Sequence, residues 1–133
     1  MRARDALGRH VPADSIDAVE PVSEDALPPD QALDLAQRLL DQGRAFSAHE
    51  VLEAVWKAAP SEERDHWQGL AQLCVGVTHL QRGNREGAVT LLRRGAGRLS
   101  GRLVSWAEAE AERIEQADPA EEVEVPQLRL RDS

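Results

Sequence analysis

The chain of 133 residues is poor in cysteine and in aromatic residues, and both shortages exclude classes of protein. Its single cysteine, Cys74, allows no disulfide within a monomer, so a reducing cytoplasm fits. Cys74 lies in an apolar run, where burial keeps a thiol protonated, so a nucleophilic role is not expected. Aromatic residues make up 3% of the sequence and tyrosine is absent, whereas Ala, Leu, Arg, Gln and Glu dominate, which favours helix over strand.

Positive charge is also scarce, since the formal net charge is −8. Residues 31–100 hold 8 acidic and 9 basic residues, so the excess of acid lies in the two flanks. This balance argues against nucleic-acid binding through bulk charge. Met1–His10 lacks the apolar core of a signal peptide, and Leu70–Leu80 is too short to span a bilayer. The sequence therefore predicts a soluble cytoplasmic protein with no nucleic-acid or membrane partner.

The chain divides into three parts by its composition and its periodicity. Residues 1–29 contain four prolines and no sustained period, so they are interpreted as an irregular N-terminal arm. Residues 30–117 carry the helical pattern and form the predicted helical domain. Residues 118–133 are acidic and then weakly alternating, which indicates an acidic tail or a short extended arm.

About five helices are expected in the helical domain. Asp30 is expected to cap the first helix, and Ser47 with Glu50 has the spacing of a capping box for the second. The connections are short, so sequential helices should be antiparallel neighbours. The predicted fold is all-α: a compact up-and-down bundle with one tetratricopeptide-like helical hairpin over residues 62–99.

The third helix is expected at the centre of the bundle, because it is apolar nearly all round. Gly69 and Gly76 lie seven residues apart on one of its faces, and each costs about 1 kcal/mol of helix propensity against Ala. We expect close approach by a neighbouring helix to compensate for this cost.

The most informative motif is H-E-x-x-E over residues 49–53 of the second helix. His49 and Glu53 are four residues apart, so their side chains share a face and have the geometry for metal binding or acid–base chemistry. Ordinary roles are also available, because Lys57 follows Glu53 in the favourable order and Glu50 fits the capping box. The motif differs from the zinc-protease signature, which needs a second histidine at the position of Glu53.

A polar stripe also runs along the otherwise apolar third helix. Its members are Gln68, Gln72 and His79, which share one face. Buried polar groups need partners, so we expect this stripe to meet polar side chains of the second helix. The candidates there are His49, Glu53 and Trp56.

Three interpretations of this cluster stay open. It is a buried hydrogen-bond network that fixes helix register, a divalent metal site with His49, Glu53 and His79 as ligands, or a pocket for a small polar ligand. With a metal, Glu50 is the candidate general base of a metal-assisted hydrolase. The favoured function is a helical binding or interaction module, and the hydrolase is its alternative.

Several linked motifs resemble a known family. They are Phe46-x-Ala48-His49-Glu50-Val51-Leu52-Glu53-x-x-Trp56, Trp67-Gln68-Gly69-Leu70-Ala71-Gln72-Leu73, His79-Leu80-x-Arg82-Gly83-Asn84-x-x-Gly87-Ala88 and Leu91-Leu92-x-Arg94-Gly95. In this order, over about residues 31–100, they resemble the bacterial and archaeal family called domain of unknown function 309. The resemblance implies a small all-helical fold but no reaction, because the members are generally uncharacterised.

The resemblance also implies a shared polar and aromatic set. Its members are His49, Glu50, Glu53, Trp56, Gln68, Gln72, His79 and Asn84, and all except Glu50 are our candidates for a ligand pocket. The stretch from Arg4 to Arg9 resembles the N-terminal arm of actinobacterial members, and 15 arginines against one lysine suit such a source. A homodimer is compatible with the sequence, and a divalent metal is the cofactor that the motif suggests.

Overall fold

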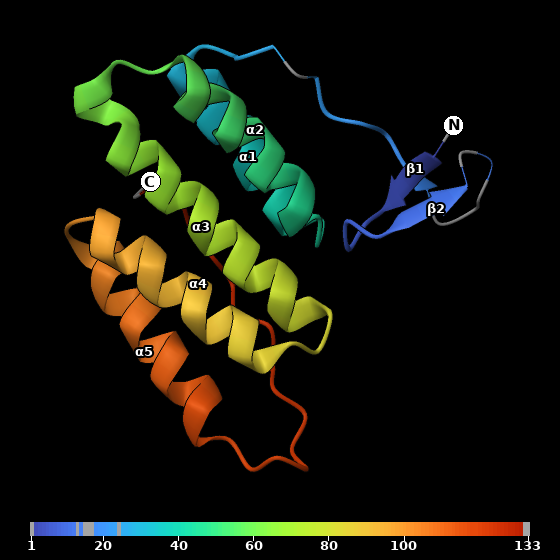
Figure 1. Ribbon diagram of the computed structural model, residues 1–133, viewed down its shortest axis with the longest axis vertical. Coiled ribbons are helices and arrows are strands. Elements are labelled where there is room, and N and C mark those ends of the chain that lie inside the picture. The colour runs from blue at the N-terminus through green and yellow to red at the C-terminus, as the bar shows by residue number, and fades with distance from the viewer. Residues whose placement is uncertain (1, 13, 15–17, 24, 132–133) are drawn as a thin grey trace.

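The computed structural model describes residues 2–12, 14, 18–23 and 25–131. Within these residues, five α-helices follow one another: α1 (Pro29–Asp41), α2 (Ala45–Ala58), α3 (Arg64–Gln81), α4 (Arg85–Arg98) and α5 (Arg102–Gln116). A short 3-10 turn, Ser61–Glu63, precedes α3. Each helix packs against the next one along the chain, with α3 in the middle of the row (Figure 1). The predicted all-α bundle of five helices is confirmed.

Two helix starts differ from the predicted caps. Ser47 lies inside the first turn of α2, where its hydroxyl accepts a hydrogen bond of 3.1 Å from Arg44. The predicted capping box with Glu50 is therefore wrong. At α1 the capping position is taken by Pro28, and Asp30 lies in the first turn, where a negative charge suits the helix dipole.

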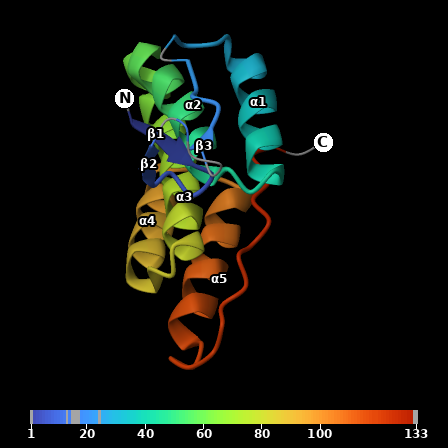
Figure 2. The same cartoon turned by 90° about the vertical axis from the view of Figure 1, so that its right-hand side faces the viewer.

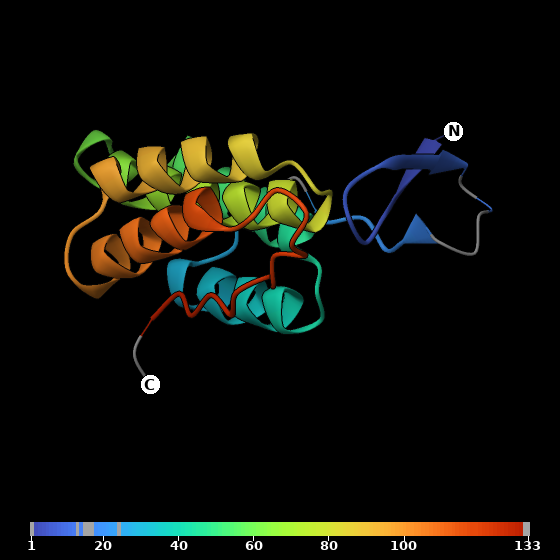
Figure 3. The ribbon, with the colours of Figure 1, turned by 90° about the horizontal axis from the view of Figure 1, so that it is seen from below.

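The N-terminal arm carries a small antiparallel sheet instead of the predicted irregular chain. Its strands are β1 (Arg2–Asp5), β2 (His10–Pro12) and β3 (Ala18–Val19), with β1 in the middle. Strands of two to four residues are too short for a periodicity of two to stand out in the sequence. The sheet lies beside the bundle, next to the end of α3 (Figures 1 and 3).

The contact between α3 and α4 is made close by glycine. A Cβ added to Gly69 would lie 2.7 Å from Cγ of Leu99, and one added to Gly76 would lie 2.9 Å from Cγ of Leu92. Gly95 faces Gly69 from α4, because its added Cβ would lie 2.9 Å from the carbonyl oxygen of Gly69. The predicted close approach of a neighbouring helix is confirmed, and that helix is α4.

Residues 118–131 follow α5 and are called the C-terminal segment below. Leu128 and Leu130 are 2% and 4% exposed and belong to the same apolar core as the helices. Figures 2 and 3 show the segment running beside α5 and on to α1. No helix in the described ranges has both the length and the apolar character needed to cross a membrane.

Candidate functional site

The H-E-x-x-E motif lies on α2 and forms a row of polar contacts along the helix. Nε2 of His49 is 2.7 Å from Oε2 of Glu53. The other carboxylate oxygen, Oε1 of Glu53, is 2.9 Å from Nζ of Lys57. Both oxygens of Glu53 are therefore engaged by residues one turn away on the same helix, as the four-residue spacing allows.

The electrostatics of this row favour a charged Glu53. The hydrogen bond from Lys57 holds the pKa of Glu53 below its usual value. Partial burial acts in the opposite direction, and the neighbouring His49 lowers the pKa further. The side chain of His49 is 17% exposed, and its second ring nitrogen, Nδ1, is buried without a hydrogen-bond partner in the described part of the chain. The row therefore leaves one polar atom of His49 unsatisfied.

Glu50 lies in a different environment from Glu53, although both are on α2. Its burial raises the pKa of the carboxyl, while nearby positive groups, including Arg4 and Arg44, oppose this effect in part. Glu50 therefore holds its proton more tightly than an exposed glutamate does. Such a shift is common among acid–base groups and also among buried structural carboxyls.

His79 belongs to a separate network, at the turn between α3 and α4. The amide nitrogen of Asn84 is 3.1 Å from Nδ1 of His79, and Oδ1 of Asn84 accepts a hydrogen bond of 2.9 Å from the Gly87 N–H. Asn84 is thereby the N-cap of α4. Burial lowers the pKa of His79, as does the nearby Arg82, so the neutral ring can accept at Nδ1.

The other predicted pocket residues are partly buried in the bundle. Gln68 and Gln72 are half-buried on α3, and Trp56 of α2 packs against the apolar core. Oε1 of Gln72 is buried and has no hydrogen-bond partner within the described residues. Helices α2 and α3 pack against each other, but a direct contact of His49 with the polar stripe of α3 stays a prediction.

The metal interpretation requires His49, Glu53 and His79 to converge on one point. Across the described ranges, no group of three or more His, Cys, Asp or Glu side chains is arranged to hold a metal ion. Glu53 is instead shared between His49 and Lys57, and His79 pairs with Asn84. The two histidines thus take part in two different hydrogen-bond networks.

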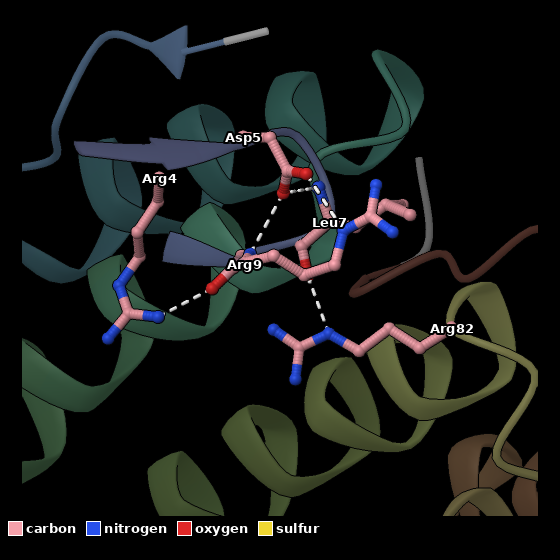
Figure 4. A network of polar contacts seen from close by, with 6 residues as sticks. Arg4, Asp5, Leu7, Arg9 and Arg82 are labelled. Carbon is pink, nitrogen blue, oxygen red and sulfur yellow. Dashed lines mark hydrogen bonds and ion pairs between the residues drawn. The ribbon is translucent and has the colours of Figure 1, made fainter. Parts of the chain in front are cut away.

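Sequence reasoning missed a loop of the N-terminal sheet that docks on the helices of the bundle (Figure 4). The loop joins β1 to β2 and is built around Asp5, which is buried and accepts the N–H groups of Leu7 (3.1 Å) and Arg9 (2.8 Å). The Arg9 side chain also donates to Asp5, at 2.8 Å. From the residue that follows α3, Nε of Arg82 donates to the Leu7 carbonyl at 2.8 Å, which ties the loop to the bundle.

Phe46 joins this loop to the motif helix. The guanidinium of Arg4 lies 4.6 Å from the centroid of the Phe46 ring, that of Arg82 lies 5.7 Å away, and the His49 ring lies 5.3 Å away. Gly8 of the loop packs so close that an added Cβ would be 2.3 Å from Cγ of Phe46. The sequence signal for this loop was an aspartate followed three residues later by a glycine, the chemistry of a tight turn.

The fold and the motif together define a small all-α protein with H-E-x-x-E on the second helix of a five-helix row. Residues 33–91 match the family described as "Domain of unknown function (DUF309)", so the predicted resemblance is confirmed over this range. The match runs from α1 into α4 and leaves out the N-terminal sheet, α5 and the C-terminal segment.

One relative is the "Uncharacterized protein YpuF" of Bacillus subtilis (strain 168). The two sequences are 42% identical over 48 residues, which are 35% of this chain and 28% of YpuF. The chain therefore covers little more than a quarter of the length of that relative. No solved structure matches the chain significantly.

Proposed function

We propose that this protein is a helical interaction module that binds extended polypeptide segments through their main chain. The observation that carries the proposal is how the helices hold the chain's own flanks. Five arginines of the bundle and its turns each donate to a main-chain carbonyl of the flanking segments: Arg82 to Leu7, Arg44 to Glu20, Arg85 to Asp118, Arg113 to Glu124 and Arg102 to Arg129, at 2.7–3.0 Å.

Arginine suits this role better than lysine does. Its planar guanidinium offers several fixed N–H donors, so one side chain can reach a carbonyl while its stem packs on the helix. Carbonyls are present in every sequence, so this mode of binding accepts segments of different composition. The helical bundle is therefore equipped to hold an extended chain with little dependence on its side chains.

We assign the polar cluster on α2 a mainly structural role in this module. His49, Glu53 and Lys57 are linked to one another, and His79 and Asn84 belong to the cap of α4. The alternative, a metal-assisted hydrolase with Glu50 as base, has less support because its proposed ligands lie in two networks. Cys74 takes no part in this module, since burial raises its pKa to about 12 and leaves it an inert thiol.

Selection from a random peptide library tests the proposal. The full-length protein is panned against displayed 12-residue peptides, and the enriched sequences are synthesised and titrated by fluorescence anisotropy. We expect saturable binding in the micromolar range, about −8 kcal/mol, as is usual for exposed peptide grooves. A helical protein of similar size and charge is panned in parallel as the control, and failure to enrich any peptide above it contradicts the proposal.

The variants His49→Ala and Glu53→Ala test the role of the polar cluster. We expect both to bind the selected peptides as the wild type does, and each to lower the free energy of unfolding by about 1–3 kcal/mol through lost hydrogen bonds. Full stability combined with lost peptide binding would show instead that the cluster itself is the binding site.

A further inference from the structure

The C-terminal segment lies on the bundle in the manner of a bound peptide. After a turn at Asp118–Glu121, it continues as extended chain beside α5 and on to α1 (Figures 2 and 3). Its first carbonyls are taken by Arg85, which donates to Asp118 and to Glu121. The next are taken by two arginines of α5, since Arg113 donates to Glu124 and Arg102 donates to Arg129, both at 2.9 Å.

Gln37 of α1 makes a two-point contact with the end of the segment. Its Nε2 donates to the Leu128 carbonyl at 3.0 Å, and its Oε1 accepts the Leu130 N–H at 2.9 Å. A neighbouring strand would contact the same two main-chain groups in a β-ladder. One amide side chain therefore fixes the position of the segment along its own direction.

Two leucines two residues apart supply the apolar part of the contact. Leu128 and Leu130 are both buried in the core, at the two-residue spacing that puts side chains of an extended chain on one side. Arg129 between them is exposed. The basic residue that follows, Arg131, pairs with Asp34 and lies 3.3 Å from Asp30, both on α1. The recognised pattern is thus Leu-x-Leu-Arg.

The groove that receives the segment is only partly filled by it. The α1–α5 groove is lined by Leu40 and Asp41 of α1, Val77 and Gln81 of α3, and Glu110 and Arg113 of α5. Gln37 of α1 holds the segment at Leu128, which also borders the groove. A cavity of about 630 Å³ remains between these helices and residues 124–128.

Two side chains at this cavity support the same conclusion. Val125 of the segment is 39% exposed, so it fills little of the space. Nε2 of Gln81 donates to the Gly43 carbonyl at 3.0 Å, but its Oε1 is buried without a partner among the described residues. A segment with a larger side chain or a hydrogen-bond donor at this point would fit the groove better than the chain's own residues do.

We propose that the α1–α5 groove is a docking site for an extended segment of a partner protein that carries the pattern Leu-x-Leu-Arg. The chain's own C-terminal segment occupies the groove and competes with that partner. This inference rests on the proposed function, of which it names one site and the chemistry of the ligand. The main-chain contacts accept many sequences, while the two leucine positions and the acidic pair on α1 select among them.

An exchange experiment on the full chain tests this site. A protease recognition sequence is inserted between Pro119 and Ala120, which are both exposed, so that cleavage leaves the segment bound without a covalent link. A fluorescent peptide of residues 120–131 is then added, and its anisotropy is measured before and after cleavage. We expect the cut protein to bind it at least about 100-fold more tightly than the uncut protein, whose tethered segment has an effective concentration near the millimolar range.

Matched variants identify the groove as the site. Gln37→Ala in the cut protein should weaken peptide binding about 5- to 30-fold through loss of two hydrogen bonds, whereas Gln31→Ala, exposed on the same helix, should leave it unchanged. A peptide with both leucines replaced by aspartate should not bind. An unrelated peptide that keeps only Leu-x-Leu-Arg should bind within about tenfold of the native segment, because the main-chain contacts are the same.

Several outcomes overturn the inference. Equal binding of the aspartate peptide, or no effect of Gln37→Ala, would mean that the segment binds elsewhere or without selectivity. Irreversible unfolding on cleavage, not restored by added peptide, would mean that the segment is only a part of the core. An uncut protein that is dimeric by light scattering would assign the groove to a second copy. If the library peptides bind equally well to the wild type and to Gln37→Ala, the proposed function is supported but the α1–α5 groove is not its binding site.

Discussion

Glu50 carries a carboxyl whose ionisation opposes folding. Burial raises its pKa above the usual 4.5, so the folded state binds the proton more tightly than the unfolded chain does. Stability from this group is therefore present at low pH and is lost as the pH rises through the raised pKa. At neutral pH the charged side chain destabilises the fold.

The variant Glu50→Gln should accordingly be more stable than the wild type at pH 7, because the amide keeps the shape of the side chain and carries no charge. The advantage should disappear below about pH 4, where the wild-type carboxyl is protonated too. Urea denaturation between pH 3.5 and 8 measures the difference. Glu63→Gln, exposed on the 3-10 turn, controls for the loss of one negative charge from an acidic chain. A gain that persists unchanged at low pH contradicts the expected linkage.

Local pairs at this scale could be predicted from the sequence, and contacts made across the chain could not. The row of His49, Glu53 and Lys57 follows from the four-residue spacing of a helix, which fixes which side chains meet. The pairing of His79 with Asn84 depends instead on how the turn between α3 and α4 orients the side-chain amide of Asn84. That amide both contacts His79 and caps α4. The metal hypothesis required a convergence that helical spacing alone does not determine.

At the scale of elements, glycine decides how closely α3 and α4 approach. Gly95 and Gly97 are two residues apart on α4, and helical spacing directs them to different sides. A Cβ added to Gly95 would be 2.7 Å from Leu73 and 2.9 Å from the Gly69 carbonyl oxygen, whereas one added to Gly97 would meet nothing within 4 Å. The same substitution should therefore have opposite effects at the two positions.

We expect Gly97→Ala to raise the free energy of unfolding by up to about 1 kcal/mol, since alanine loses less backbone entropy in a helix. Gly95→Ala should lower it by about 1–3 kcal/mol, because its methyl group forces α3 and α4 apart. Thermal and urea denaturation of both variants measure the two effects. Equal shifts of the same sign would mean that helix propensity, and not the contact, determines the role of Gly95.

The helices themselves could be predicted because their apolar periodicity extends over 13 to 18 residues. The three strands could not, since β1, β2 and β3 are only two to four residues long and show no recognisable repeat. The capping box failed for a related reason: α2 begins before Ser47, at a residue with no side-chain cap. Element boundaries depend on contacts of the flanking chain, such as the hydrogen bond from Arg44 to Ser47.

At the scale of the whole molecule, both flanks belong to the folded structure. The N-terminal sheet precedes the helical bundle in sequence, the C-terminal segment follows it, and both contact it. The N-terminal sheet and its loop contact Phe46 of α2 and Arg82, which follows α3, and the C-terminal segment contacts α1, α4 and α5. The sequence predicted only an irregular arm and an acidic tail or short extended arm, because charge counts do not reveal main-chain contacts. The carbonyls that the arginines bind are independent of side-chain identity, so no composition could have indicated them.

The docking of the N-terminal sheet depends on one glycine, and this dependence can be measured. Gly8 has a φ of +81°, and an added Cβ would lie 2.3 Å from Phe46. Gly43 has a φ of +76° and open space around it, so it provides the matched control. Alanine at either position adopts a left-handed conformation at a cost of about 1–2 kcal/mol. Only Gly8→Ala should also displace the ring of Phe46.

Hydrogen exchange separates these two effects, because the loop can detach while the bundle stays folded. Gly43→Ala should lower the global free energy of unfolding by about 1 kcal/mol. The protection of the Leu7 and Arg9 amides should then fall by no more than this global change. Gly8→Ala should remove the protection of those two amides, which Asp5 accepts in the docked loop, while amides in the middle of α3 keep theirs. Retained protection at Leu7 and Arg9 would mean that Phe46 moves aside without cost and that the loop holds itself.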